Sequence, residues 1–477
     1  MRGDRIVAAA VLAATLVAGG CTGAGGGDRG HGTTPAGGFE PGATSAGDSY
    51  FPEYGNGGYD VAHYHLEVTY DPAEERLSGV ATITATTTAG VSSVSLDLTG
   101  LTVRGATVDG QAATVTHTEQ KLAVVPPAGL PAGEEFTLAV TYDGRPAPVD
   151  DPQLGSNGFH HTGDGAFAIG QPRSASTWFP VNDHPRDKAT YTIEITVPEG
   201  LSAVSNGVPQ GRTDDAGWTT WRWAERVPMA SYLTTLVIGD YRVDTAAHGD
   251  GRPLVTAVHA DLPDSVDRQV RRTGDIADAL SEWFGPYPAE AYGGIVLADD
   301  RVGFALETQS RPTYGPGFFR GGQDAAWVIV HELAHQWFGN SVSLDDWRDM
   351  WLNEGFATYA EWLWEERSGG LRAQQSFDFF YDRADDAFWQ VEPGDPGPDR
   401  IFHPAVYQRG AMTVHALRLA VGDQDFFRIL TEWTSQFRDR NATTADFVTL
   451  AEKVSGESLQ PLFDQWLYTP ERPSHPR

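Results

Sequence analysis

The sequence of 477 residues contains a single cysteine, Cys21, so no internal disulfide can stabilise its fold. Basic residues are also few, with 34 Lys plus Arg against 64 Asp plus Glu. The resulting formal charge of −30 argues against a nucleic-acid-binding protein, because phosphate backbones are bound by clustered basic side chains. Hydrophobic residues make up 40% of the chain and charged residues 21%, which excludes a wholly disordered chain.

Long apolar runs are absent as well. The run from Ile6 to Val17 has 12 residues and is too short to cross a bilayer as a helix. It follows two arginines and precedes Ala18 to Gly20 and then Cys21, which resembles a bacterial lipoprotein signal. We therefore predict a signal peptide over residues 1–21 and a lipid-anchored cysteine, although Ala18 stands where such signals usually carry leucine. The alternative is a plain signal peptide cleaved near Gly20, and both predict an exported protein, either lipid-anchored at the cell membrane or secreted.

The rest of the chain divides into three parts by composition. Residues 22–50 are rich in Gly, Ser, Thr and Pro, which predicts a flexible tether. Residues 51–250 alternate apolar and polar positions, as in residues 63–70 (H-Y-H-L-E-V-T-Y), which predicts antiparallel strands. Residues 251–477 carry apolar residues at helical spacing, and we expect helices over 266–284, 324–338, 350–367 and 411–421. The sequence thus predicts an α+β protein with a β domain followed by a mostly helical domain.

One motif predicts a metal site. His331 and His335 stand four residues apart in the pattern H-E-x-x-H, so they share one face of a helix and can bind the same ion. A catalytic zinc needs three protein ligands, and Glu354, with 18 residues between it and His335, supplies the third. Glu332 is then placed to act as the general base toward a water molecule on the metal. We predict one zinc ion per chain. The tetrahedral oxyanion that forms during the reaction needs a further hydrogen-bond donor besides zinc, and the spacing of residues alone does not identify this donor.

Two other groups near or outside this motif are weaker candidates. Asp345, Asp346 and Asp349 could orient a zinc ligand, or they could form a solvated loop. His160 and His161 could bind a metal, but we interpret them as an exposed turn.

The segments H-E-L-A-H-Q-W-F-G-N (residues 331–340) and W-L-N-E-G-F-A (residues 351–357) resemble the M1 family of zinc aminopeptidases, the gluzincins. The resemblance covers roughly residues 59–470. It implies an N-terminal antiparallel β-saddle followed by a thermolysin-like zinc catalytic domain, in agreement with the order of strands and helices predicted above.

The resemblance also implies roles for further residues. Glu307 in F-A-L-E-T (residues 304–308) corresponds to the glutamate that binds the substrate α-amine, and the strand around Ala305 pairs with the substrate backbone. Gln171 stands where many members have a second amine-binding glutamate. Tyr407 in Y-Q-R-G matches the tyrosine that donates to the oxyanion.

We therefore predict a zinc-dependent aminopeptidase that hydrolyses the N-terminal peptide bond of peptides with a free N-terminus. The alternatives are an endopeptidase or another hydrolase on the same site, and a non-catalytic peptide-binding surface lipoprotein. We expect no nucleic-acid partner, membrane contact only through Cys21, and a monomer. The sequence does not predict the side-chain preference.

Overall fold

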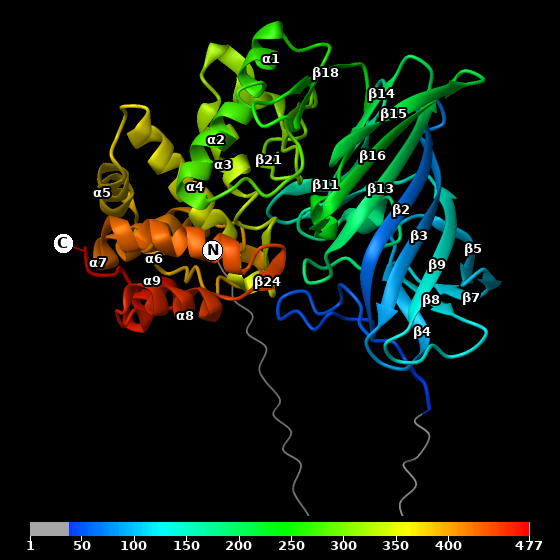
Figure 1. The fold of residues 1–477 in the computed structure, drawn as a ribbon, viewed down its shortest axis with the longest axis horizontal. Helices are drawn as coiled ribbons and strands as arrows, with labels where there is room; N and C mark the ends of the chain where they lie inside the picture. The colour runs from blue at the N-terminus through cyan, green and yellow to red at the C-terminus, as the bar shows by residue number, and fades with distance from the viewer. Residues whose placement is uncertain (1–37, 477) are drawn as a thin grey trace, which may run out of the picture. The chain divides into compact units, whose positions relative to one another are not determined.

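The structure is a computed structural model that describes residues 38–476. The predicted signal peptide, Cys21 and the first part of the predicted tether lie outside the described residues. The chain from Phe39 onward forms one compact unit, which begins with strands and continues with helices (Figure 1). We refer to strands β1–β17 as the β domain and to the chain from β18 onward as the helical domain.

The β domain is built around one large sheet. It has eight strands in the order β15 (Val208–Asp215), β16 (Trp218–Met229), β13 (Ala189–Pro198), β2 (Tyr59–Asp71), β3 (Arg76–Thr87), β9 (Glu135–Gly144), β5 (Thr102–Val108) and β6 (Gln111–Ala112). Neighbouring strands are antiparallel except for the parallel pair β13 and β2. The alternation that predicted β2 is explained by burial, because Tyr64, Leu66 and Val68 face the core while the residues between them are more exposed.

Two smaller sheets complete the β domain. The first contains β1 (Glu40–Pro41), β4 (Val91–Asp97), β8 (Lys121–Val125) and β7 (Thr114–His117). The second contains β10 (Pro148–Asp151), β11 (Gly155–His161), β12 (Ala166–Ile169), β17 (Leu236–Gly239) and β14 (Ser202–Ser205). Two short 3₁₀ helices, η1 (Ala175–Thr177) and η2 (Ser231–Leu233), connect strands of this part.

The helical domain begins with a five-stranded sheet in the order β18 (Tyr241–Ala247), β19 (Pro253–His259), β20 (Tyr292–Val296), β22 (Thr313–Tyr314) and β21 (Ala305–Leu306). Strands β19 and β20 are parallel and are connected through α1 (Asp264–Val270) and α2 (Thr273–Phe284). The single helix expected over residues 266–284 is thus two helices, separated by Arg271 and Arg272. Strand β21 forms an edge of the sheet.

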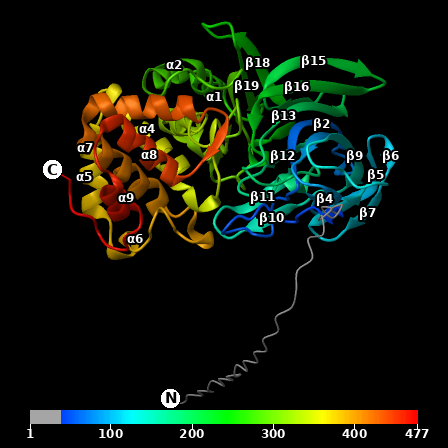
Figure 2. The same cartoon turned by 60° about the horizontal axis from the view of Figure 1, so that its bottom comes forward.

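Most of the remaining chain is helical. The elements are η3 (Pro316–Gly322), α3 (Ala326–Ala334), β23 (Val342–Leu344), η4 (Trp347–Asp349), α4 (Trp351–Arg367), α5 (Ala373–Arg383), α6 (Asp386–Trp389), η5 (Pro398–Arg400), α7 (Pro404–Gln436), β24 (Arg440–Ala442), α8 (Thr444–Ser455) and α9 (Gln460–Leu467). Helix α4 packs between α3 and α7. Figure 2 shows these helices beside the strands of the β domain. Among the described residues, no helix combines the length and the apolar character that a membrane span requires.

The two domains are joined by buried and partly buried hydrogen bonds. Asn206 of the β domain donates through Nδ2 to the carbonyl of Gln309, at 2.9 Å. Lys188 donates through Nζ to the carbonyls of Asn340 and Ser341, at 2.7 and 2.9 Å. From composition we predict a domain boundary near residue 250, and this boundary remains a prediction. Strand β18, which precedes residue 250, already pairs with β19 of the helical domain.

The N-terminal segment differs from the sequence-based expectation. We expected the flexible tether to reach residue 50, but the residues from Phe39 onward are part of the fold, with β1 paired to β4. Asp48 is 3% exposed and accepts hydrogen bonds from the backbone amides of Tyr50, Phe51 and Trp347. Its carboxylate also lies 3.1 Å from His184 of the β domain. Composition alone could not show these partners, which belong to distant parts of the chain.

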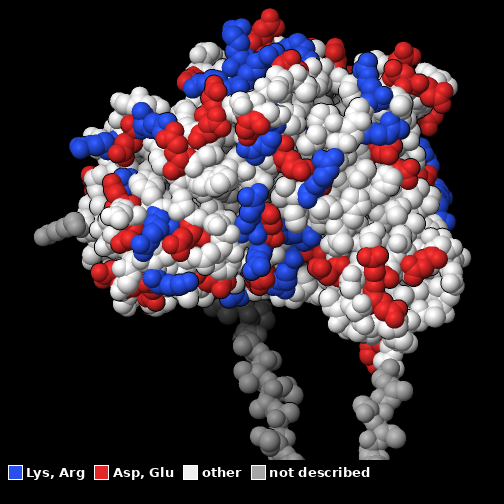
Figure 3. Space-filling view, in the orientation of Figure 1, with Lys and Arg blue, Asp and Glu red and all other residues white. Residues whose placement is uncertain are grey.

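Charged side chains are spread over the surface. Acidic and basic groups are interspersed on the face shown in Figure 3 and do not form one continuous basic patch there. The overall excess of acidic residues is a property of the sequence.

Candidate metal centre

Helices α3 and α4 bring three metal-ligating side chains together. His331 lies in the last turn of α3, and His335 follows at its C-terminal cap. Glu354 lies in the first turn of α4. The Nε2 atoms of His331 and His335 are 3.2 and 3.4 Å from the same carboxylate oxygen of Glu354. The predicted ligand set therefore converges on one point.

The spacing of these atoms fits zinc. Two ligands of a tetrahedral zinc ion with bonds of about 2.0–2.1 Å lie about 3.3–3.4 Å apart. The two measured nitrogen–oxygen separations match this value. Burial alone would lower the pKa of His335, yet Glu354 and Glu307 raise it to about 9, which shows that the local field favours positive charge. The residues therefore suit a divalent cation with nitrogen and oxygen ligands.

The opposite ring nitrogens are held by hydrogen-bond acceptors. Nδ1 of His331 lies 2.7 Å from a carboxylate oxygen of Glu361, and Nδ1 of His335 lies 3.0 Å from the carbonyl oxygen of Phe338. Because both partners are acceptors, each Nδ1 must donate, and each neutral imidazole presents the lone pair of Nε2 to the metal position. These contacts fix the tautomer that a zinc ligand requires.

The three aspartates considered from the sequence do not have this role. Asp345 pairs with Arg186, Asp346 with Ser49 and Asp349 with Thr444. Proximity in sequence suggested them, but each carboxylate contacts one of these other side chains, and within the described residues none bonds to His331 or His335. Glu361, which the sequence analysis missed, lies two turns after Glu354 on α4 and could have been found from that spacing.

Replacing Glu361 by glutamine is expected to weaken zinc binding about 10- to 100-fold, because glutamine can still accept from Nδ1 of His331 but removes the negative charge that makes this histidine a more basic ligand. Competition with a chelator of known affinity measures the dissociation constant directly. Glu365→Gln, one turn further along the same helix, is the matched control and should leave zinc affinity unchanged. Equal affinities in both variants would contradict the assigned contact.

Glu332 lies beside the metal position without being one of its three ligands. It is 5% exposed, and its carboxylate forms a second close group with Glu307 and His335, in which the candidate ligand atoms lie within 4.8 Å of one another. Burial raises the pKa of Glu332 to about 8 against the opposing effect of His331 and His335. A cation at the metal position would lower it again.

Glu307 directly follows the edge strand β21 and lies close to Glu332 and His335. It is 2% exposed, and Gln171 donates through Nε2 to its carboxylate at 2.9 Å. Ala305, two residues earlier, is paired on one side only, with Tyr314 of β22. The buried carboxylate and the open strand edge together form a place where the end of an extended peptide can add to the sheet.

Three residues without an assigned role surround Glu307. Gln336 and Asn340 donate to its backbone carbonyl at 3.2 and 2.8 Å, so the residues that follow His335 connect this strand to helix α3. Burial, reinforced by the nearby Glu307 carboxylate, raises the pKa of Tyr232, a buried residue of the β domain, well above its ordinary value. No local pattern in the sequence indicates Tyr232, because it is distant from the metal motif along the chain.

Tyr407 lies in the first turn of α7, where two glycines allow a close helix contact. Gly355 of α4 faces Gly410 of α7, and a Cβ built on either residue would lie 2.9 Å from the backbone of the other. This approach places the Tyr407 ring 6.1 Å from the His331 ring, with its hydroxyl near Glu354. Burial, reinforced by Glu354, raises the pKa of Tyr407 well above its ordinary value, so the phenol keeps its proton and can donate.

A cleft of about 410 Å³ contains all of the predicted site residues, namely Gln171, Ala305, Glu307, His331, Glu332, His335, Glu354 and Tyr407. Its apolar walls come from Leu154, Phe304, Phe318, Trp327 and Phe402. Its described lining includes four glutamates and no Lys or Arg. The cleft can therefore hold a peptide whose amino end is cationic.

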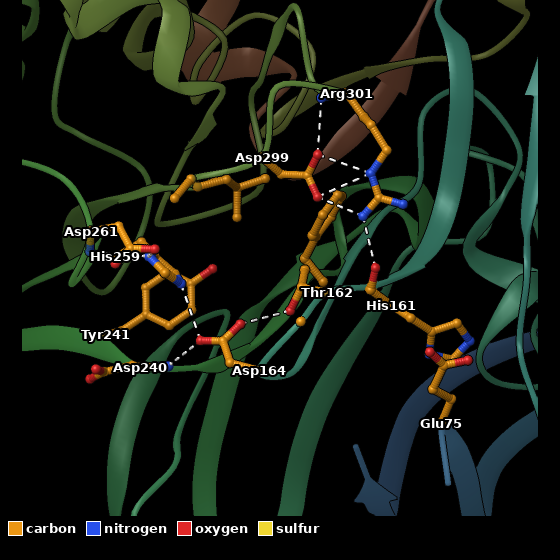
Figure 4. Close-up of a pocket in the computed structure, with 14 residues that line it drawn as sticks. Glu75, His161, Thr162, Asp164, Asp240, Tyr241, His259, Asp261, Asp299 and Arg301 are labelled. Atoms are coloured by element: carbon orange, nitrogen blue, oxygen red, sulfur yellow. Dashed lines mark hydrogen bonds and ion pairs between the residues drawn. The ribbon is translucent and has the colours of Figure 1, made fainter. Parts of the chain in front are cut away.

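A larger cavity, of about 710 Å³, lies between β11 and β12 on one side and β18 to β20 on the other (Figure 4). Its polar groups pair with one another: Asp164 with His259 at 3.2 Å and Asp299 with Arg301 at 2.9 Å. No three of its side chains form a metal-ligand group among the described residues. We interpret this cavity as part of the contact between the two domains.

The neighbouring histidine pair corrects one prediction. His160 and His161 form the end of strand β11, and the expectation of an exposed turn was wrong. His160 is 1% exposed and stacks on Phe167 at 4.6 Å. Burial lowers its pKa to about 4, so it is a neutral core residue.

Comparison with known proteins agrees with this geometry. Residues 61–233 match the profile of the peptidase M1 N-terminal domain, and residues 319–466 match that of the peptidase family M1 domain. Human glutamyl aminopeptidase is 28% identical over 316 residues, which cover 62% of this chain and 33% of that protein. Aminopeptidase M1 of Arabidopsis thaliana is 29% identical over 327 residues and is covered to 36%. The chain thus spans about a third of the length of these curated relatives.

A solved structure is similar over its whole length. The M1 zinc metallopeptidase of Deinococcus radiodurans is 33% identical, with a TM-score of 0.81, over 91% of this chain and 99% of that one. A variant of the Deinococcus protein has been crystallised with a Tyr-Ser-Ala substrate, and a related two-domain structure with L-arginine.

Proposed function

Because the chain belongs to peptidase family M1, we propose that it is a zinc-dependent aminopeptidase that removes the N-terminal residue of peptides. The observation that carries this proposal is the position of Glu307. Its buried carboxylate lines the cleft beside Glu332 and His335, where a peptide amine would lie next to the metal. A charged amine gains a charge-assisted hydrogen bond at this position, and a blocked amine does not.

In the proposed mechanism, His331, His335 and Glu354 hold zinc, which when bound polarises a carbonyl group and lowers the pKa of water. Glu332 accepts a proton from the attacking water as the general base and delivers it to the nitrogen of the departing amine. The Tyr407 hydroxyl donates a hydrogen bond to the carbonyl oxygen as negative charge develops on it.

Substrate alignment is assigned to the other side of the cleft. Glu307 and Gln171 bind the α-ammonium group of the substrate, and Gln171 contributes hydrogen bonding but no charge. The open edge of β21 at Ala305 pairs with the substrate backbone, so that the first carbonyl of the peptide is held near the metal.

Comparison of a free peptide with its N-acetylated form tests this function. We expect kcat/KM for a leucine-initiated peptide to be at least about 100-fold higher with a free amine, since acetylation leaves the buried Glu307 carboxylate without a partner. Leucine is chosen because the cleft lining offers no cation to an acidic first residue. Equal cleavage of both peptides would identify an endopeptidase or another hydrolase and would refute the proposal.

We also propose that the protein is exported and anchored through Cys21, on the strength of its N-terminal sequence. Mass spectrometry of the N-terminal peptide from the membrane fraction tests this. Acylation of Cys21 supports the anchor, and an unmodified N-terminus at another residue refutes it.

A further inference from the structure

A second groove, of about 590 Å³, lies beside the catalytic cleft. Its apolar wall comes from the start of α3, the end of α4 and helix α5 with the turn before it. We call it the aromatic groove and define it by Trp327, Trp364, Leu371, Phe379 and Phe380.

The side chains of the aromatic groove are unusually exposed. In the described chain, seven large hydrophobic side chains are at least 39% exposed, and three of them line this groove: Trp327 at 49%, Leu371 at 42% and Phe379 at 44%. Single exposed apolar residues are common on protein surfaces, whereas several gathered in one groove suit an apolar ligand group.

The aromatic groove is continuous with the catalytic cleft. Trp327 and Glu361 line both cavities. Trp327 stands one helical turn before His331, and its ring packs against Phe318 of the cleft at 5.7 Å between centroids. A ligand that leaves the cleft along this wall therefore enters the groove.

The position of the amine anchor sets the direction of a bound peptide. Glu307 lines the catalytic cleft but not the aromatic groove, whereas Trp327 and Glu361 line both. A peptide whose amine is bound at Glu307 can therefore reach the groove only with residues that follow the first. Glu361 and Glu365 follow Glu354 on helix α4. At a helical rise of about 1.5 Å per residue, their backbones lie about 10 and 16 Å beyond that of Glu354 along the helix axis. An extended peptide advances about 3.3 Å per residue, so its fourth to sixth residues reach this distance.

The charge around the groove disfavours an acidic side chain. Asp324, Glu361 and Glu365 line it, and no Lys or Arg does. Asp324 is paired with Arg272 and Glu361 accepts a hydrogen bond from His331, so Glu365 is the carboxylate that remains along α4 to repel an acidic substrate residue.

We infer that the aromatic groove is a distal subsite that binds an aromatic or large aliphatic side chain of the substrate, four to six residues from its N-terminus. This inference rests on the proposed aminopeptidase activity. It assigns the groove to the substrate itself, because the groove shares a wall with the cleft and lies on the path that the amine anchor sets.

A positional scan of heptapeptides tests the subsite. Each peptide begins with leucine and carries one phenylalanine at positions three to seven of an otherwise alanine and serine chain, and leucine release is measured. We expect phenylalanine at one or more of positions four to six to raise kcat/KM about tenfold over serine, since burial of one aromatic side chain is worth about this factor. Aspartate at the same position should give no gain.

The double variant Leu371→Ala with Phe379→Ala should remove this gain and leave hydrolysis of leucine 4-nitroanilide unchanged. Both side chains are exposed, so the substitutions should not affect folding. The matched control is Leu419→Ala with Phe39→Ala, two residues of similar exposure, 40% and 45%, that line neither cavity. The control should retain the gain.

Three results would overturn the inference. One is the absence of any positional gain in the wild-type enzyme, and another is a gain that persists in the double variant. The third is a wild-type dimer that the double variant converts to a monomer, which would assign the groove to self-association. If the enzyme released leucine from none of the substrates, the proposed aminopeptidase function would be refuted, and the subsite with it.

Discussion

Glu332→Gln is expected to lower kcat about 10³- to 10⁴-fold while the protein still binds one zinc ion per chain, because loss of a general base has an effect of up to this size. Glutamine has nearly the same shape but cannot accept the proton. Glu332 is not one of the three ligands, so zinc binding should persist. Initial rates with leucine 4-nitroanilide and metal analysis of the same sample measure the two properties together.

The size of this loss depends on Glu332 acting alone as the base. The other carboxylates of the site are committed elsewhere: Glu307 accepts from Gln171, Glu361 from His331, and Glu354 is a ligand. An unchanged turnover at full zinc occupancy would therefore refute the assigned mechanism. Loss of zinc from the variant would instead show that Glu332 contributes to metal binding.

Removal of zinc by a chelator is expected to reduce activity to below about 1% and to lower the melting temperature, because the metal supplies both Lewis-acid chemistry and binding energy to the folded state. Without a cation, the buried carboxylates of Glu307, Glu332 and Glu354 lie close together with only the two histidines to offset their charge. Free zinc at a thousand times its dissociation constant would stabilise the fold by about 4 kcal/mol.

Restoration of activity and melting temperature by one equivalent of zinc is the control for chelator damage. Magnesium should restore neither, since it prefers oxygen ligands and octahedral geometry. His335→Ala provides an independent route to the same state and should not recover with added zinc at that concentration. Full activity of a metal-free sample would contradict the zinc assignment.

The metal ligands were predictable from the sequence because their geometry is local. The spacing of His331 and His335 alone places them on one helix face. Glu354 joins them if the next helix packs beside the first. The roles of Glu307, Gln171 and Tyr407 came from family resemblance, since nothing in their immediate sequence determines them. Their proximity depends on β21, the β domain and a glycine contact between two helices.

The missed residues differ in how far they could have been predicted. Glu361 shares α4 with Glu354 and was within reach of a helical spacing argument. Tyr232 could not be found in this way, because its proximity to Glu307 requires the β domain to pack on the helical domain. The assignment of residues up to 50 to a tether failed for a similar reason, since the partners of Asp48 are His184 and Trp347.

The contacts of Asp48 bear on how a soluble form of the protein should be produced. A truncation that begins at residue 51 follows the composition boundary but removes a carboxylate to which the backbone of Trp347 and the ring of His184 are bonded. Each buried donor left without a partner costs about 1–3 kcal/mol. A truncation that begins at residue 38 keeps the β1–β4 pairing and this carboxylate. The choice of start residue therefore decides whether purified protein represents the stability of the native fold.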